Sequence, residues 1–327
     1  MTFQGVAGVL SWLGLAYLMS IAIILLARPV VARLAGTNWA YALWGVLLVP
    51  PFAMLAPSTM NDSVRIWNYP ALGASATDIM LVALLGLWVI GVLATGSVST
   101  WQSVQVRRSV RSSFNALSVR QMSQIEQSCT RANVFPAPKT IFSSYCGSPA
   151  VMNGLVPTLV LPDDFFQKYS PRERNLILHH ELIHLRRFDL VWNVMFRSLR
   201  CLLWFVPFIS HCERVFRSDQ ERSCDHSVIC DEPDNSLADY AQALYKTVIQ
   251  TSSAAGVVGF RNTRHELIIR TELLGTHRRT RSRSMAGLIA LTTCVLLSIS
   301  VSANSNVFPD SAVLSSSWCS IYGRLGL

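Results

Sequence analysis

Long uncharged apolar stretches flank a single charged stretch along the chain. A bilayer span needs about 20 apolar residues, because a helix rises about 1.5 Å per residue across roughly 30 Å of hydrocarbon. Four stretches meet this length, at residues 5–27, 39–57, 79–97 and 285–303. The pattern therefore predicts three transmembrane helices within residues 1–100, a folded domain over 101–284, a fourth transmembrane helix, and a short tail over 304–327.

Arginines close to these stretches predict their orientation, because basic residues near spans stay on the cytoplasmic side. Arg28 and Arg33 follow the first stretch, and a run of arginines from Arg278 to Arg283 precedes the last. Further arginines follow the third stretch. We therefore expect both termini outside, the 101–284 domain in the cytoplasm, and a multi-pass chain in the bacterial inner membrane, with the lipid bilayer as its first partner.

Composition supports a membrane protein. Of the 327 residues, 51% are hydrophobic and 14% are charged, whereas about a quarter of the residues of a soluble domain are charged. The net charge of +9 comes mainly from basic residues beside the spans, without interleaved aromatic residues, so we expect no direct binding to nucleic acid. The eight cysteines include no CxxC pair, and no disulfide framework is expected.

Within residues 101–284, the pattern predicts short strands among amphipathic helices. Lys139–Tyr145 and Thr158–Pro162 are apolar, β-rich runs and predict strands. Ser170 is an expected helix N-cap, followed by a proline and by Glu173, which completes a capping box. Polar residues within 190–209 favour a buried or membrane-adjacent helix there over a fifth span. The other expected helices cover residues 107–129, 217–230, 237–251 and 264–274.

The most specific chemical pattern is the H-E-x-x-H string at residues 180–184. Residues four apart on a helix point about 40° from each other and lie roughly 6 Å apart along the axis. His180 and His184 are therefore expected to bind one metal ion. Glu181 lies on the flank of that face and is expected to act as general base on a water molecule. His179 points about 100° away from His180 and is not an expected ligand.

A catalytic zinc site needs a third protein ligand and one open position. Glu221, on a later predicted helix, is the candidate ligand. Asp225 lies four residues further on the same helical face and is expected to accept the free ring N–H of a ligand histidine. Asp189 is expected to support the ligands in the same way, or to form a salt bridge with the arginines before it. The competing ligands are His211, His226, Asp189 and Asp219.

Four segments complete a recognisable set: GLVPTLVLP (154–162), HHELIHLRRFDLVWN (179–193), WFVPF (204–208) and ERSCD (221–225). Together they resemble the BlaR/MecR family of membrane-integrated zinc metallopeptidases. The resemblance implies a mainly α-helical polytopic membrane protein with a cytoplasmic gluzincin-like α+β zinc metallopeptidase domain. It also implies one zinc ion per chain, bound by His180, His184 and Glu221, with Glu181 as catalytic base.

The resemblance further implies that the chain cleaves a cytoplasmic protein, usually a transcriptional repressor, and sometimes itself. The antibiotic sensors of this family carry a large extracellular penicillin-binding domain after the fourth span. Here 24 residues follow Ala303, with no S-x-x-K motif, and we expect no β-lactam sensing by this chain. A signal is expected to enter through the 58–78 loop, the tail, the spans, a separate sensor protein or a homodimer.

Two other functions stay open from the sequence. One is a membrane quality-control metalloprotease resembling the HtpX/CAAX-protease group, which also joins H-E-x-x-H to a later E-x-x-x-D. The other is a non-proteolytic signalling scaffold with a structural zinc ion, which the intact Glu181 disfavours because a structural site needs no base. The segment 156–162 is a candidate to pair with an extended substrate, or else an ordinary internal strand.

Overall fold

The computed structural model describes residues 3–50, 74–112, 114–115, 118–152, 157–231, 237–254 and 284–303. The chain divides into two compact units. The first unit comprises Met1–Leu34, Ala42–Gly86 and Ser284–Leu327, and the second comprises Ala35–Tyr41 and Leu87–Arg283. The second unit therefore takes in residues 35–41 and 87–100 in addition to most of the predicted domain over 101–284. We call it the peptidase unit after the family that its motifs resemble.

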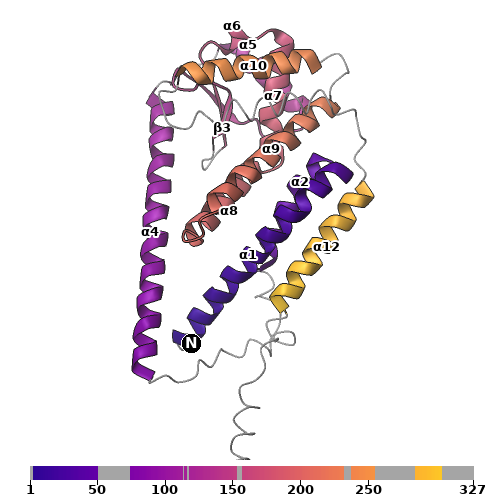
Figure 1. Cartoon of the computed structure of the whole chain (residues 1–327). Helices are drawn as coiled ribbons and strands as arrows, with labels where there is room; N and C mark the ends of the chain where they lie inside the picture. Colours follow the sequence, from indigo (N-terminus) through magenta and orange to yellow (C-terminus); the bar gives the residue numbers. More distant parts are fainter. Residues whose placement is uncertain are drawn as a thin grey trace, which may run out of the picture. The chain divides into compact units, whose positions relative to one another are not determined.

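The first unit is built around two apolar helices, α1 (Phe3–Leu34) and α12 (Ser284–Ala303). They pack against each other and against the short 3-10 helix η1 (Leu43–Leu48) (Figure 1). The hydroxyls of Ser20 and Ser298 lie 3.5 Å apart in this contact. Of the predicted span 39–57, residues 39–48 lie in α2 (Thr37–Ala42) and η1, and residues 51–57 lie outside the described chain.

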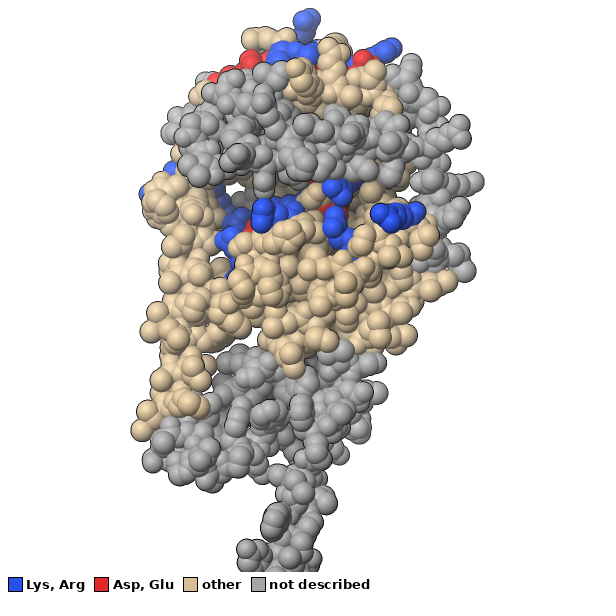
Figure 2. Space-filling model, in the orientation of Figure 1, with Lys and Arg blue, Asp and Glu red and all other residues tan. Residues whose placement is uncertain are grey.

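Two described segments are long and apolar enough to cross a membrane. They are Leu13–Leu34 in α1 and Val82–Val110 in α4 (Ala74–Ser112), with mean hydropathies of 2.1 and 2.0. They overlap the first and third predicted spans. In the described part of α4 from Ile79 onward, the visible face shows charged atoms only toward the C-terminal end (Figure 2). The apolar part of α12, Gly287–Ile299, is shorter, so the four-span topology stays a prediction.

The peptidase unit contains a four-stranded sheet with the order β1-β2-β4-β3. Its strands are β1 (Phe114–Asn115), β2 (Lys139–Ser143), β3 (Ala150–Met152) and β4 (Thr158–Leu161). β2 and β4 pair in parallel, and β1 and β3 pair antiparallel to them. The two longer strands were predicted, because their apolar residues pack into a core: three successive residues of β4, Leu159 to Leu161, are fully buried. A run buried on both faces is typical of a central parallel strand.

Helices surround the motif helix α7 (Pro171–Arg186), which packs against α5, α8, α9, α10 and β3 (Figure 1). The bounds of its neighbours are α5 (Val119–Arg131), α6 (Phe165–Lys168), α8 (Asp189–Leu202), α9 (Ile209–Asp231) and α10 (Leu237–Ala254). The predicted helices 217–230 and 237–251 lie within α9 and α10. The predicted helix 264–274 lies outside the described residues.

The prediction of one helix over residues 107–129 is wrong. α4 ends at Ser112, β1 follows, and α5 begins after Ser118. The physical reason is a capping box: the Ser118 amide donates to Gln121 Oε1 at 2.9 Å, and the Gln121 amide donates to Ser118 Oγ at 3.4 Å. Such a box satisfies amides that a helix start leaves without partners, and so it starts a new helix here.

Candidate metal centre

The histidine motif lies on a helix whose start and orientation are fixed locally. The Ser170 amide donates to Glu173 Oε2 at 2.7 Å, and the Glu173 amide donates to Ser170 Oγ at 3.3 Å, as the sequence predicted. Lys246 of α10 adds an ion pair to Glu173 at 2.7 Å. Leu176 and Ile183 pack into the core between α7, α9 and α10. These contacts hold α7 so that one of its faces meets α9 and α10.

Three potential ligand side chains converge on one point. His180 Nε2 lies 3.2 Å from His184 Nε2 and 3.3 Å from Glu221 Oε2, and His184 Nε2 lies 3.5 Å from Glu221 Oε1. The three side chains thus outline a triangle in which a different Glu221 oxygen faces each imidazole. One ligand atom of each residue lies within 4.8 Å of the others, which leaves room for an ion at zinc–ligand distances of about 2.0–2.2 Å. The side chains of His180 and His184 are 8% and 12% exposed, and that of Glu221 is 31% exposed. The centre is therefore open on the Glu221 side.

His180 is held from behind by a tyrosine and an aspartate. The Tyr240 hydroxyl of α10 lies 2.9 Å from His180 Nδ1 and donates to Asp225 Oδ1 at 2.6 Å. Asp225 Oδ1 itself lies 3.3 Å from His180 Nδ1. Since Tyr240 gives its proton to Asp225, its oxygen accepts from the His180 Nδ1–H, which leaves Nε2 directed at Glu221. Burial alone lowers the pKa of His180, but the carboxylates of Asp225 and Glu221 outweigh burial and raise this pKa to about 10.

His184 is held by a buried carboxylate directly. His184 Nδ1 lies 2.7 Å from Asp189 Oδ2, and the Asp189 side chain is only 1% exposed. The other oxygen of Asp189 accepts from the Tyr41 hydroxyl at 2.8 Å and lies 3.5 Å from Arg187 Nε. The Asp189 side chain thus contacts a histidine of the motif and an arginine at the same time.

Glu181, the predicted base, follows His180 on α7 and is partly exposed. Its charge acts on the Cys146 thiol, which lies after β2: burial and the negative charge of Glu181 both raise the pKa of that thiol. The loop after β2 therefore lies close to the Glu181 carboxylate. No spacing along the chain associates Cys146 with the motif.

A second group of potential ligands comprises His184, Asp189 and Cys224. Cys224 Sγ lies 3.4 Å from His184 Nδ1 and 3.7 Å from Asp189 Oδ2. Burial raises the pKa of Cys224 well above its ordinary value. The guanidinium of Arg187 also lies 3.5 Å from this sulfur and disfavours a cation there. This group is therefore a hydrogen-bonded network behind His184.

The structure brings His180, His184 and Glu221 together, with Asp225 and Asp189 directly behind them. Among the described residues, the competing candidates His211, His226 and Asp219 belong to neither group. His179 lies 3.3 Å from Asp231 instead. Tyr240 and Tyr41 were not predicted, because a tyrosine in an apolar segment carries no spacing signal that links it to a distant histidine or aspartate.

Comparison with known proteins matches most of the chain, including most of the peptidase unit, to one family. The model described as BlaR1 peptidase M56 matches residues 58–274. The regulatory protein BlaR1 of Bacillus licheniformis is 21% identical over 156 residues, which cover 47% of this chain and 26% of that protein. The methicillin resistance mecR1 proteins of Staphylococcus aureus and Staphylococcus epidermidis are 27% identical over 88 residues, which cover 27% of this chain and 15% of theirs.

The aligned segments thus span about a quarter or less of the length of these curated relatives. The family match, in contrast, covers well over half of the 327 residues. It confirms the predicted resemblance, which depended on the H-E-x-x-H string and the segments around it. The chain belongs to the BlaR1 peptidase M56 family, a family of metallopeptidases.

Proposed function

We propose that this chain is a zinc metalloendopeptidase of the gluzincin type that transmits a signal by cleaving a cytoplasmic regulatory protein. The observation that carries the proposal is the triangle of His180 Nε2, His184 Nε2 and Glu221, with sides of 3.2–3.5 Å. Two imidazoles and one carboxylate, open on one side, match the ligand set of a catalytic zinc site.

The donor atoms suit zinc better than the harder divalent cations. Mg²⁺ and Ca²⁺ prefer shells of oxygen ligands, whereas two of the three donors here are imidazole nitrogens. A zinc ion bound there supplies Lewis-acid chemistry, which polarises a scissile carbonyl and lowers the pKa of water toward about 7. The buried carboxylates of Asp189 and Asp225 hold the two rings in the tautomer that such binding needs.

Glu181 performs the proton transfers in this proposal. It adjoins His180 on α7, and its partial exposure allows access to solvent and substrate. The carboxylate takes the proton of the attacking water and later gives it to the leaving amine. Because neither step requires Glu181 to bind the ion, the three ligand positions stay with His180, His184 and Glu221.

An extended substrate requires a strand edge with free backbone groups. The suggested pairing at segment 156–162 is wrong, because β4 is bonded to β2 on one side and to β3 on the other. β3 is the last strand in the sheet order and contacts the motif helix α7. The outer edge of β3 is therefore the substrate-pairing position that this proposal requires.

The signalling role follows from the family and from the names of the relatives, which are a regulatory protein and methicillin resistance proteins. We propose a repressor as the substrate, self-cleavage as a second reaction, and a separate sensor protein or a second copy as the partner. The proposed topology has four spans, both termini outside and the peptidase unit in the cytoplasm. It is supported by the apolar segments in α1 and α4 and by the arginines beside the spans.

The experiment is a comparison of protein fragments in cells that express the intact chain or the Glu181→Gln variant. The proposal expects fragments that appear only with the intact chain, and an unchanged zinc content in the purified variant. Glu126→Gln makes the same glutamate-to-glutamine change on the exposed face of α5. It is the matched control and should retain cleavage. Identical fragment patterns for the intact chain and Glu181→Gln, with zinc bound in both, would contradict the proposal and favour the scaffold.

A further inference from the structure

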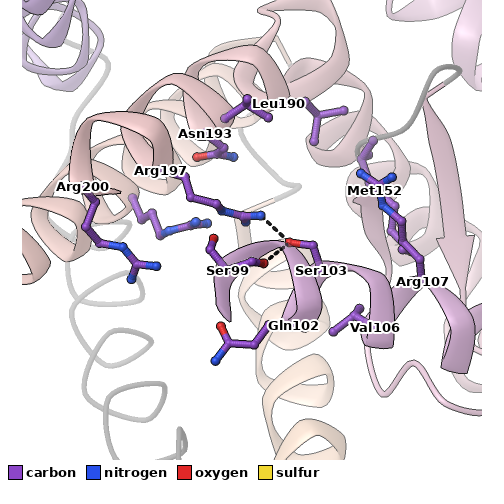
Figure 3. A pocket seen from close by; sticks show the side chains of 13 residues that line it. Ser99, Gln102, Ser103, Val106, Arg107, Met152, Leu190, Asn193, Arg197 and Arg200 are labelled. Carbon is purple, nitrogen blue, oxygen red and sulfur yellow. Dashed lines mark hydrogen bonds between the residues drawn. The ribbon is translucent and has the colours of Figure 1, made fainter. Parts of the chain in front are cut away.

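A cavity of about 380 Å³ in the peptidase unit shares no residue with the metal centre. It lies between the C-terminal part of α4, helices α8 and α9, and strand β3 (Figure 3). Its volume falls in the range of roughly 300–1,000 Å³ that is usual for small-molecule sites. Four of its lining residues are arginines: Arg107, Arg197, Arg200 and Arg217. Among the lining residues in the described chain, none is acidic.

One carboxylate outside the lining neutralises part of this charge. Glu213 accepts from Arg200 Nη1 at 3.1 Å and from Arg217 Nη2 at 3.0 Å. The Glu213 side chain is 12% exposed, so it fixes the two guanidinium groups at the cavity wall. One carboxylate shared by two arginines leaves a positive excess even before the other two arginines are considered.

Arg197 points into the cavity with a neutral partner. Its Nη1 donates to Ser103 Oγ at 2.6 Å, and Ser103 Oγ donates to the Ser99 carbonyl at 2.9 Å (Figure 3). Burial, together with the positive charges of Arg217 and Arg200, lowers the pKa of Arg197. The guanidinium groups thus repel one another, and an anion between them would relieve that repulsion.

An unsatisfied acceptor lies in the same cavity. The Oδ1 atom of Asn193 is buried and has no hydrogen-bond partner in the described part of the chain. A buried polar atom without a partner is costly. A ligand that carries a hydroxyl beside its anionic group would satisfy Asn193 and the arginines together. Guanidinium forks bind phosphate in a bidentate manner, so a phosphate ester fits both observations.

The position of the cavity along α4 indicates where such a phosphate comes from. Ser99 and Arg107 lie about 26 and 38 Å along the helix from Val82, where the apolar segment begins. A hydrocarbon layer of roughly 30 Å places both residues near headgroup depth. Trp101 lies between them and is 62% exposed, and tryptophan is enriched at this depth. The placement at headgroup depth rests on the proposed function, in which α4 crosses the membrane.

We propose that the cavity binds the phosphate group of an anionic phospholipid headgroup. Arg197 and Arg200 donate to the phosphate oxygens, and Asn193 accepts from a headgroup hydroxyl. The shared chemistry is a phosphate anion, for which a lipid and free inorganic phosphate are the two sources. Lipid binding here uses none of the three proposed zinc ligands, so its loss leaves the zinc content unchanged.

The test uses the full chain in nanodiscs of phosphatidylcholine with about 20% phosphatidylglycerol, followed by native mass spectrometry of the retained lipids. The double variant Arg197→Gln/Arg200→Gln removes two positive charges and should weaken selective phosphatidylglycerol retention by roughly tenfold or more. Val106→Trp fills the cavity from α4 while keeping every arginine, and should reduce the same retention. Arg120→Gln removes one charge on the exposed face of α5, and this variant should behave like the intact chain. Equal retention in all four proteins overturns the proposal.

A second arm distinguishes the two sources of phosphate. The chain in neutral detergent, without added lipid, is titrated with inorganic phosphate against chloride of equal ionic strength while its Tm is measured. A phosphate-specific rise that the double arginine variant lacks, with equal lipid retention in the first arm, assigns the cavity to free phosphate and overturns the lipid source. Zinc content in each variant reports separately on the metal centre.

Discussion

The two histidines of the motif occupy equivalent positions on α7 but are held differently by the rest of the peptidase unit. His184 meets the carboxylate of Asp189 directly at 2.7 Å. His180 meets the Tyr240 hydroxyl at 2.9 Å, with Asp225 at 3.3 Å as a second acceptor. Asp189 is itself fixed by Tyr41 and Arg187. The residues that support the two rings therefore matter for metal binding as much as the motif itself. The His184 ring depends on a single carboxylate, and the His180 ring has two acceptors.

This difference predicts that the two sides tolerate substitution unequally. Removing the single carboxylate behind His184 leaves that ring without a strong acceptor. Removing one of the two acceptors behind His180 leaves the other in place. Zinc affinity, measured by competition with a chelator, is a common scale for both sides.

Asp189→Asn should have the largest effect. The substitution keeps the size of the side chain but removes the charge that orients His184, and loss of such a partner costs about 10–100-fold in metal affinity. Asp239→Asn changes an aspartate of α10 that pairs with exposed Arg172, and should leave zinc affinity unaltered. An unchanged affinity for Asp189→Asn would show that the hydrogen bond at His184 has no role in metal binding.

The pH dependence of zinc affinity should come next in size. His180 has a pKa of about 10 in the metal-free chain, so it holds a proton at neutral pH that the ion must displace. Zinc affinity should rise by about tenfold per pH unit from pH 6.5 toward 10. In the metal-free chain the same group stabilises the fold below its unfolded pKa of about 6.5, and this contribution is lost as the pH rises through 10.

Calorimetry in two buffers with different ionisation enthalpies measures the proton that His180 releases on zinc binding. One proton per zinc ion at pH 7.5 is the expected result. Release of no proton would mean that the carboxylates of Asp225 and Glu221 do not hold His180 in its charged form.

Tyr240→Phe should have a smaller effect than Asp189→Asn. The ring and its packing are kept, and only the hydroxyl between His180 and Asp225 is lost. Asp225 is then the remaining acceptor, and zinc affinity should fall by a few-fold, about the contribution of one hydrogen bond. A loss as large as that of Asp189→Asn would abolish the contrast between the two sides.

Cys224→Ser should have the smallest effect. Its thiol lies 3.4 Å from His184 Nδ1 but faces the supporting network and not the ligand triangle. Zinc content and affinity should stay within about twofold of the intact chain, because the proposed ligands are unchanged. Loss of bound zinc would instead place the ion among His184, Asp189 and Cys224.

Local signals in the sequence predicted much of the site. The Ser170 capping box fixed the start of α7, and the spacing of His180 and His184 fixed their common face. The spacing of Glu221 and Asp225 within one helix indicated that the two carboxylates reach the same region. Each of these signals lies within a few residues and follows from helix geometry.

Features that depend on distant segments could not be predicted in the same way. Tyr240 reaches His180 only after α10 packs against α7, and Tyr41 reaches Asp189 only after residues 35–41 pack against α9. The sheet order β1-β2-β4-β3 depends on pairing between separate segments, and β1 is only two residues long. The missed break before α5 is different, because Ser118 and Gln121 carried a local capping signal that the continuous helical pattern obscured.

X-ray absorption spectroscopy at the zinc edge of the purified full chain tests the central claim most directly. The account predicts a first shell of nitrogen and oxygen at about 2.0–2.1 Å, with two imidazoles and no sulfur. The Glu221→Ala variant should lose one oxygen from that shell or lose the ion. A sulfur scatterer at about 2.3 Å in the intact chain would contradict the assignment of His180, His184 and Glu221 as the ligands.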